Sequence, residues 1–267
     1  MPLHLNPPLR DSLAAAQRPL FGGWVCSVSP IMAEIMAGSG LDWVLIDMEH
    51  APNSLESTLA QLYAVSAYPV TPVVRVPAAD PLTIKQVLDL GAQTILVPMV
   101  STPDEARAAA EAAQYPPRGR RGVGSALARS ARWNRVDGYL HSAADHVSVF
   151  VQIETAEGVA NAEAIAATPG IDGVFVGPSD LAASLGVLGQ QAHPDVIAAV
   201  HRTFNGVAAA GKPVGVNAFD PQAARAYADA GARFVLVGAD VALVARASEA
   251  LATTFIHGTG DAKRASY

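Results

Sequence analysis

The sequence of 267 residues predicts a single (β/α)8 barrel of the TIM type, built on a parallel eight-stranded sheet. Three observations carry this prediction: short β-branched runs recur eight times, helical stretches separate them, and a glycine stands before four of the runs. Strands that alternate with helices pair in parallel, and eight such units in about 250 residues have the usual size of this barrel. A doubly wound open sheet is the alternative. The barrel is favoured because the chain shows no linker and no glycine-rich dinucleotide loop after a strand.

The predicted strands occur in two sequence contexts. Four follow a helical run and a glycine: "AGSGLDWVLID", "LDLGAQTILVPM", "ATPGIDGVFVG" and "ADAGARFVLVG". The other four are "GGWVCSV", "PVTPVVRVP", "HVSVFVQIE" and "KPVGVNAF". Gly40, Gly91, Gly170 and Gly231 stand where a helix ends in a left-handed residue, which glycine adopts without steric cost. Stretches such as "STPDEARAAAEAAQ" have the apolar spacing of amphipathic helices.

Three segments lie outside this repeat. Residues 1–19 form an N-terminal extension, and residues 257–267 are predicted to be a flexible tail because they are polar and contain glycine. Residues 115–146 form an extra segment before the fifth strand and carry six arginines. This segment has two interpretations, a solvated basic helix or an arm that reaches a neighbouring subunit.

Composition excludes several classes of function. The formal charge is −6, and no basic stripe with interleaved aromatic residues is present, so nucleic acid is not an expected partner. No run of about 18 uncharged apolar residues predicts a membrane span, and the first residues lack the pattern of a signal peptide. Cys26 is the single cysteine, so no internal disulfide forms, which fits a reducing cytoplasm.

Polar side chains gather where the predicted strands end, and in this fold the active site lies at the carboxyl ends of the strands. They are Asp47, Glu49, His50, Arg75, Gln152, Glu154, Ser179, Asp180 and Asn217. Single residues have structural alternatives. Arg75 could form a salt bridge to Asp80 at the rim, Asp180 could interact with a helix dipole, and His50 could be an ordinary hydrogen-bonded histidine. The convergence of acids, a base, an arginine and an amide on one rim favours an active site.

Glu154 and Asp180 come from adjacent strands and predict a metal site. Two carboxylates without a cysteine suit a hard divalent cation, Mg²⁺ or Mn²⁺ with Co²⁺ tolerated. Two protein ligands leave about four octahedral positions for water and a chelating 2-oxo acid, whose carbonyl the metal would polarise.

Lysine is scarce, which bears on the mechanism. The chain has three lysines, Lys85, Lys212 and Lys263, and none stands at the carboxyl end of a predicted strand. A Schiff-base mechanism therefore lacks an obvious nucleophile, and carbanion chemistry at this rim would depend on a metal.

Several motifs between about Phe21 and Phe255 of this chain resemble those of one enzyme family. "GLDWVLIDMEHAPN", "VRVP", "RGVGSALARSARWNR", "VQIET" and "GIDGVFVGPSDLAASLG" resemble the HpcH/HpaI family of metal-dependent pyruvate aldolases, and among them the 4-hydroxy-2-oxoheptanedioate aldolases. The resemblance implies that His50 is the proton acceptor, directly or through a water, and that Arg75 stabilises the enolate. It implies that Glu154 and Asp180 hold the metal. It also implies that the keto acid is contacted by Gln152, Ser179 and Asp180.

The resemblance carries three further implications. Asp89 would raise the basicity of the histidine, although the predicted topology places Asp89 toward the other end of its helix and leaves Asp47 as a rival partner. Members are hexamers that exchange a C-terminal helix, and the "RGVG" arm would line the adjacent subunit's site through Val123. Asn217 departs from the pattern, because an apolar residue stands there in related chains beside the aldehyde.

The sequence thus predicts a class II aldolase, a carbon–carbon lyase that joins a 2-oxo acid, pyruvate or hydroxypyruvate, to an aldehyde or cleaves the product. One alternative is an acyl-CoA lyase of the same barrel type, for which no extended basic and adenine-binding surface is found. A second alternative is a non-catalytic barrel that binds keto acids or phosphates. The presence of His50 and Arg75 argues against it.

Overall fold

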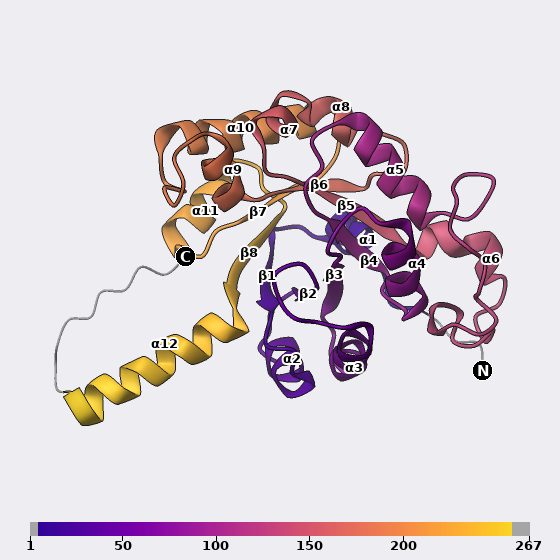
Figure 1. The fold of residues 1–267 in the computed structure, drawn as a ribbon, viewed down its shortest axis with the longest axis horizontal. Coiled ribbons are helices and arrows are strands. Elements are labelled where there is room, and N and C mark those ends of the chain that lie inside the picture. The colour runs from indigo at the N-terminus through magenta and orange to yellow at the C-terminus, as the bar shows by residue number, and fades with distance from the viewer. Residues whose placement is uncertain (1–4, 258–267) are drawn as a thin grey trace.

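The computed structural model, which describes residues 5–257, is a closed parallel barrel of eight strands in the order β1 to β8 (Figure 1). The predicted fold class is therefore confirmed, and each predicted run overlaps one strand. The strands are β1 Leu20–Val25, β2 Trp43–Asp47, β3 Thr71–Arg75, β4 Thr94–Val97, β5 Ser148–Ile153, β6 Gly173–Val176, β7 Val214–Asn217 and β8 Phe234–Ala239.

Helices connect the strands, and most of them cover the outside of the barrel. They are α1 Leu9–Ala15, α2 Pro30–Ala37, α3 Leu55–Val65, α4 Pro81–Asp89, α5 Pro103–Ala113, α6 Tyr139–Ser142, α7 Ala156–Ala160, α8 Ala162–Ala166, α9 Pro178–Ser184, α10 Pro194–Ala209, α11 Pro221–Asp229 and α12 Asp240–Ala252. Short helical turns are η1 Arg129–Ala131, η2 Ala143–His146 and η3 Thr253–His257. The predicted left-handed glycines are confirmed, with φ of 93° at Gly40 and Gly91, 91° at Gly170 and 111° at Gly231.

Aromatic side chains fill the interior of the barrel. Trp43 meets Phe175 and Phe234 edge-on, with ring centroids 6.5 and 5.8 Å apart. Glycine makes room for these rings, since a Cβ on Gly22 would overlap the indole of Trp43 and one on Gly215 would overlap the ring of Phe234. The interior is therefore a packed core and not a channel.

Helix α1 belongs to the predicted N-terminal extension and closes the amino end of the barrel. Its Leu9 and Leu13 are buried in the same cluster as the interior aromatic rings. The backbone N–H of Leu9 donates to Oγ1 of Thr94, the first residue of β4, over 2.9 Å. The extension thus contributes to the core of the barrel.

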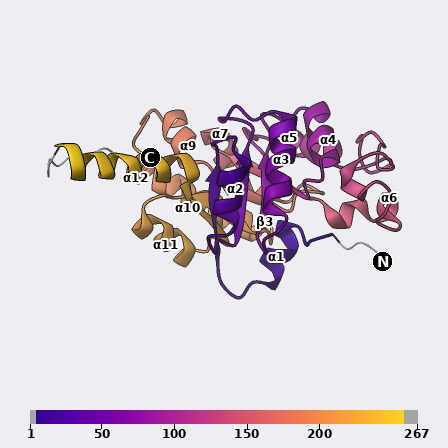
Figure 2. The same ribbon diagram turned by 90° about the horizontal axis from the view of Figure 1, so that it is seen from below.

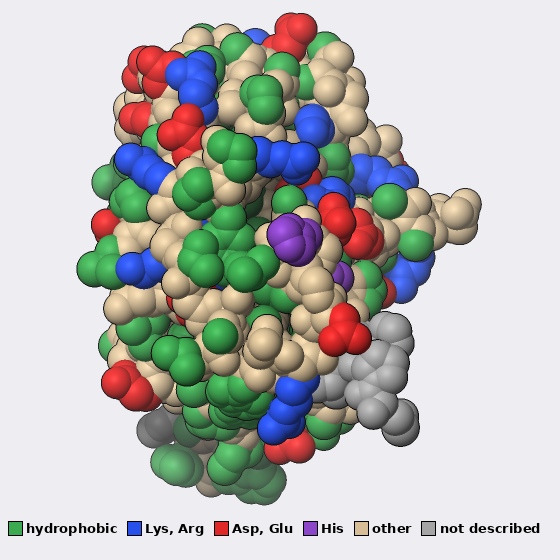
Figure 3. Space-filling view, turned by 90° about the vertical axis from the view of Figure 1, so that its right-hand side faces the viewer, with side chains coloured by type: hydrophobic (Ala, Val, Ile, Leu, Met, Phe, Trp, Pro, Cys, Tyr) green, Lys and Arg blue, Asp and Glu red, His purple; other side chains and the backbone are tan. Residues whose placement is uncertain are grey.

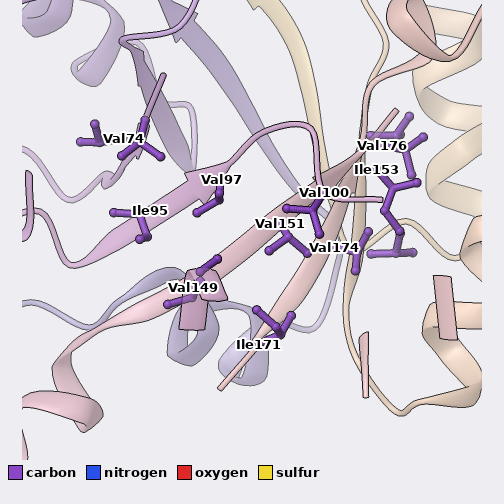
Figure 4. Packing of buried hydrophobic residues seen from close by; sticks show 14 of the residues in the cluster. Val74, Ile95, Val97, Val100, Val149, Val151, Ile153, Ile171, Val174 and Val176 are labelled. Atoms are coloured by element: carbon purple, nitrogen blue, oxygen red, sulfur yellow. The ribbon is translucent and has the colours of Figure 1, made fainter. Parts of the chain in front are cut away.

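A second layer of core lies between the strands and the helices. Because strand side chains alternate, residues such as Val74, Ile95 and Val151 point outward toward the helices (Figure 4). Alanines of α5 complete this layer, with Ala106 and Ala109 fully buried. Small helix side chains allow the helices to pack closely against the β-branched strands.

Residues 115–146 do not form the basic helix of the first interpretation, because the structure shows short turns around a small core. Ala131, Val136, Tyr139 and Ala143 are buried together there. Arg121 is also buried instead of solvated, so this interpretation is wrong. Figure 3 views the molecule from the side on which α6 lies in Figure 1, and shows basic side chains scattered among apolar and acidic ones.

Helix α12 projects away from the barrel, on the side opposite α6 (Figures 1 and 2). Its exposed apolar side chains, with those of the turn that follows, are Val241, Leu243, Val244, Leu251, Phe255 and Ile256. Most of the predicted flexible tail, residues 258–267, lies outside the described residues. None of the helices within residues 5–257 has the length and apolar character needed to cross a membrane.

Candidate active site

The polar residues at the barrel mouth continue the inward-facing rows of the strands. Side chains of a strand alternate between two faces, so Asp47 follows the inward Trp43 and Leu45, and Arg75 follows Val73. Asp47 and Arg75 are also paired in the register of β2 and β3. The fold therefore brings two residues 28 positions apart to the same point of the rim.

Arg75 is held by two carboxylates. Its Nε and Nη2 donate to Oδ1 and Oδ2 of Asp47 over 2.8 and 2.9 Å, and Nη1 lies 2.9 Å from Oε2 of Glu49. Gln152 adds its Oε1 at 3.5 Å from Nη1. The alternative salt bridge to Asp80 is not formed within the described residues, because that carboxylate caps α4 by accepting from the backbone N–H and hydroxyl of Thr83.

His50 lies at the surface, on the turn that follows β2. The carboxylate of Asp47 shapes this turn by accepting hydrogen bonds from the backbone N–H groups of Glu49 and His50 over 3.0 and 3.3 Å. The imidazole is 66% exposed, and its Nε2 lies 3.7 Å from Oε1 of Glu49. In this chain the carboxylate beside the imidazole is that of Glu49. The carboxylate of the rival partner Asp47 contacts the backbone N–H of His50, and it pairs with the guanidinium of Arg75.

Glu154 is a buried carboxylate that lacks an ion pair among the described residues. Its Oε1 accepts from the backbone N–H of Met99 over 2.7 Å, and its Oε2 accepts from Nε2 of Gln152. Burial raises the pKa of Glu154 to about 7, and the negative charges of Glu49 and Asp180 act in the same direction. Burial also raises the pKa of Glu49, against the opposing effect of Arg75 and His50.

Asp180 and Ser179 lie in the first turn of α9, which directly follows β6. Asp180 is exposed, and its negative charge contributes to the raised pKa values of both Glu49 and Glu154. The hydroxyl of Ser179 accepts from Nε2 of Gln191 over 2.7 Å. The predicted pair of adjacent strands thus supplies one buried and one exposed carboxylate.

This donor set fits a hard divalent cation. Burial raises the pKa values of Glu154 and Glu49, and the negative charge of Asp180 acts in the same direction on both, so a cation would neutralise the negative charge of this site. Oxygen is the ligand that Mg²⁺ and Mn²⁺ prefer, and two carboxylates with open positions are typical of Mg²⁺ sites that also hold substrate. Within residues 5–257 no group of three or more His, Cys, Asp or Glu side chains is arranged to hold a metal ion by protein ligands alone.

The structure does not bring Asp89 to this cluster within one chain. Asp89 is the last residue of α4, which returns from the carboxyl end of β3 to the amino end of β4. Its carboxylate pairs with Nη2 of Arg121 over 2.8 Å, and Arg121 belongs to the extra segment. Val123 in the same segment is 65% exposed.

Lysine placement agrees with the prediction for the two lysines that the structure describes. Lys85 lies within α4, and Lys212 precedes β7 at the amino end of the barrel. Lys263 lies outside the described residues.

Sequence reasoning missed two residues of the mouth, Trp24 and Met99. Met99 has a left-handed backbone, with φ of 57°, and its N–H reaches Glu154. Trp24 lies beneath the guanidinium of Arg75. Applying the strand-end rule to "TILVPM" would have named Met99, and the alternation of "GGWVCSV" would have pointed Trp24 inward.

Comparisons with known proteins agree with this geometry. Residues 20–247 match the family model described as HpcH/HpaI aldolase/citrate lyase. A hydroxypyruvate/pyruvate aldolase of Deinococcus radiodurans is 52% identical over 257 residues, 95% of this chain and 92% of that protein. A 4-hydroxy-2-oxo-heptane-1,7-dioate aldolase of Salmonella dublin is 50% identical over 246 residues, 92% of this chain and 93% of that protein.

A solved structure extends the agreement to the fold. The crystal structure of an HpcH/HpaI aldolase/citrate lyase family protein from Burkholderia cenocepacia has a TM-score of 0.87 and 44% sequence identity. The alignment covers 91% of this chain and 96% of that chain. The predicted resemblance and the predicted class of carbon–carbon lyase are confirmed, and the chain belongs to the HpcH/HpaI aldolase/citrate lyase family.

Proposed function

We propose that this protein is a metal-dependent aldolase that reversibly joins the enolate of a 2-oxo acid to an aldehyde. Pyruvate and hydroxypyruvate are the proposed donors, because relatives about half identical to the chain are named for them or for a 4-hydroxy-2-oxo diacid. The observation that carries the proposal is the buried Glu154, which has no ion pair among the described residues and shares one mouth with Asp180 and Arg75.

Glu154 and Asp180 would hold the cation, either Mg²⁺, Mn²⁺ or Co²⁺. Bound there, the cation would supply Lewis acidity toward the keto oxygen of a chelating 2-oxo acid. Gln152 holds Glu154 in place through its amide N–H and reaches Arg75 through its amide oxygen. We assign contacts with the 2-oxo acid to Gln152, to Asp180 and to the backbone of Ser179.

Arg75 would stabilise the negative charge that develops on the keto oxygen. Its guanidinium is buried and fixed by Asp47 on one edge, so it needs little reorganisation when charge appears. Preorganised donors of this kind are among the largest contributors to catalysis. Asp47 is assigned a positioning role, since its carboxylate holds Arg75 and the turn that carries His50.

His50 would accept the C3 proton of the 2-oxo acid, directly or through a water. Its imidazole is exposed at the mouth and lies beside the carboxylate of Glu49, which would stabilise the imidazolium as the proton arrives. Within one chain Asp89 does not lie near His50, so it could not act on this histidine as the family resemblance implies. We therefore place any contact between Asp89 and His50 across two copies of the protein.

We further propose that the protein is a closed homo-oligomer, most simply a hexamer. Helix α12 leaves the barrel and exposes Leu243, Val244 and Leu251, an apolar surface that a second copy would cover. The exposed Val123 lies on the extra segment that we assign to the neighbouring site.

A donor-by-acceptor panel tests the proposed function. Pyruvate and hydroxypyruvate are each combined with a series of aldehydes, with Mg²⁺, Mn²⁺ or Co²⁺ or after chelation with EDTA, and aldol products are quantified. We expect products that depend on the cation and return when it is restored. A protein that binds pyruvate but forms no product with any combination would be a non-catalytic barrel, and cleavage of acyl-CoA thioesters alone would favour the acyl-CoA lyase.

A further inference from the structure

Trp24 forms a floor beneath Arg75. The centre of its indole ring lies 4.2 Å from Cζ of the guanidinium, a cation–π contact, and the residue is almost fully buried in β1. The carboxylates of Asp47 and Glu49 hold the edge of the guanidinium, whereas the indole covers one of its faces. Ion pairs on the edge limit sliding in the plane, and the ring limits tilting toward the barrel interior.

A local irregularity of the sheet aims Trp24 at this position. The pairing of β1 with β8 shifts between Gly22 and Trp24, so that Gly22 opposes Leu236 and Trp24 opposes Ala239. Irregularities of this kind re-aim side chains and occur next to active sites.

Asn217 fixes the edge of the indole that carries its N–H. Nε1 of Trp24 donates to Oδ1 of Asn217, the last residue of β7, over 2.9 Å. A buried indole N–H requires an acceptor, and this hydrogen bond also restricts rotation of the ring about the side-chain torsions. The contacts run in sequence from Asn217 through Trp24 to Arg75, from one side of the barrel mouth to the other.

We propose that Trp24 and Asn217 are positioning residues for Arg75, and that Asn217 acts through the indole N–H of Trp24. This inference rests on the proposed function, in which Arg75 faces the charge that develops on the keto oxygen. The amide of Asn217 stands at the mouth, where a direct contact with the aldehyde is the competing explanation. The two explanations differ in the step that they affect, because enolate formation requires no aldehyde.

The test is a double-mutant cycle on enolate formation alone. Exchange of the pyruvate methyl protons with D₂O is followed by NMR with Mg²⁺ and without aldehyde, for the unaltered protein, Asn217→Leu, Trp24→Phe and the double variant. Each single substitution removes the same hydrogen bond and retains most of the side-chain volume. We expect each to lower kcat for exchange by roughly three- to tenfold with little change in KM, and the double variant to resemble Trp24→Phe.

Trp43→Phe is the matched control. The indole N–H of Trp43 also bonds inside the barrel, to the backbone oxygen of Leu20 over 3.4 Å, but at the amino end. We expect this variant to lose thermal stability without a change in kcat for exchange. Melting curves establish that every variant is folded at the assay temperature.

Three outcomes would overturn the inference. Exchange that is unaltered in Asn217→Leu, together with altered turnover of particular aldehydes, would assign Asn217 to the aldehyde. Additive losses in the double variant would show that Asn217 acts independently of Trp24. An unaltered protein that forms neither exchange nor aldol products would instead reject the proposed function, and with it the role of Arg75.

Discussion

Asp47 and Arg75 form a two-pronged ion pair buried at the mouth of the barrel, with Nε–Oδ1 and Nη2–Oδ2 distances of 2.8 and 2.9 Å. The two residues face each other because the parallel register of β2 and β3 pairs them directly. The same carboxylate accepts two backbone N–H groups of the following turn. One aspartate therefore fixes both the arginine that we propose to stabilise the enolate and the turn that carries the proposed base.

Two substitutions of Arg75 should distinguish the effect of its charge from the effect of its donor geometry. Arg75→Ala leaves Asp47 buried without a cation, which should destabilise the fold by about 3–5 kcal/mol. Arg75→Lys keeps the charge and should fold, but an ammonium group lacks the fork of donors, so kcat should fall by up to about 10²–10³ with a smaller change in KM. Steady-state kinetics and denaturant unfolding of both variants measure these effects.

Asp80→Ala is the control for a structural role of the rim. Asp80 caps α4, so its loss should cost about 1 kcal/mol of stability and leave kcat unchanged. Equal losses of kcat in Asp80→Ala and Arg75→Lys would contradict the assignment of Arg75.

Binding of the cation should depend on Glu154 and Asp180. Glu154→Gln and Asp180→Asn each remove one negative oxygen ligand, so Mn²⁺ binding measured by calorimetry and the cation-dependent turnover should both be lost. Glu157→Gln, in the first turn of the adjacent α7, is a matched control that should bind Mn²⁺ normally. Chelation should inactivate the protein reversibly. Inactivation by borohydride with pyruvate would instead indicate a Schiff base on lysine.

Metal affinity should depend on pH through Glu154. Burial raises the pKa of this carboxyl from 4.5 to about 7 in the metal-free protein, and a cation binds the ionised form. The affinity for Mn²⁺ should therefore rise with pH up to about 7 and then level off. Calorimetric titrations between pH 5.5 and 8 check this expectation, and an affinity that is flat across the range would contradict it.

The same shift makes the metal-free fold less stable as pH rises. Between pH 4.5 and about 7 the folded protein retains a proton on Glu154 that the unfolded chain has released, so the free energy of unfolding falls through this window. Glu154→Gln cannot ionise and should remove this part of the pH dependence. Urea unfolding of both proteins at several pH values measures the difference.

Asp89 and His50 should complement each other between subunits. The structure separates them within one chain, so His50→Ala and Asp89→Asn subunits, each impaired alone, should form mixed oligomers with more activity than the sum of the two. Such oligomers contain sites that pair an intact His50 with an intact Asp89. Differently tagged chains allow the mixed species to be purified, and an absence of any gain would reject the contact.

Helix α12 should be required for assembly. Val244→Glu with Leu251→Glu places two charges on its exposed apolar side, and burying them against another copy would be costly, so light scattering should show a smaller particle. Arg246 lies on the other side of the helix, so Arg246→Ala should leave the mass of the assembly unchanged. A monomeric mass for the unaltered protein would reject the proposed oligomer.

The strands, the cap glycines and most residues of the mouth were predictable because each depends on local pattern. Alternation within a strand and glycine at a helix end are properties of a few consecutive residues. The helical nature of Leu9–Ala15 was missed because seven residues give little periodicity and their burial depends on the barrel that they close.

Contacts between distant strands could not be predicted in the same way. The sequence offered Asp80 as a partner for Arg75 because it is close in the chain, but the register of β2 and β3 selects Asp47. The bond between Trp24 and Asn217 spans 193 positions and depends on an irregularity in β1–β8 pairing. Such contacts follow from the closure of the barrel, which no short segment encodes.

The closed amino end of the barrel has a consequence for the order in which the two substrates bind and leave. Leu9, Leu13 and the rings around Trp43 fill that end, and at the mouth the inward Arg75 and Gln152 are buried whereas Asp180 and His50 are exposed. If a 2-oxo acid binds against the buried pair as proposed, we expect it to bind before the aldehyde and, after cleavage, to leave second. The compound that binds last would then shield the first one from solvent, and initial-rate kinetics should show a compulsory order of binding.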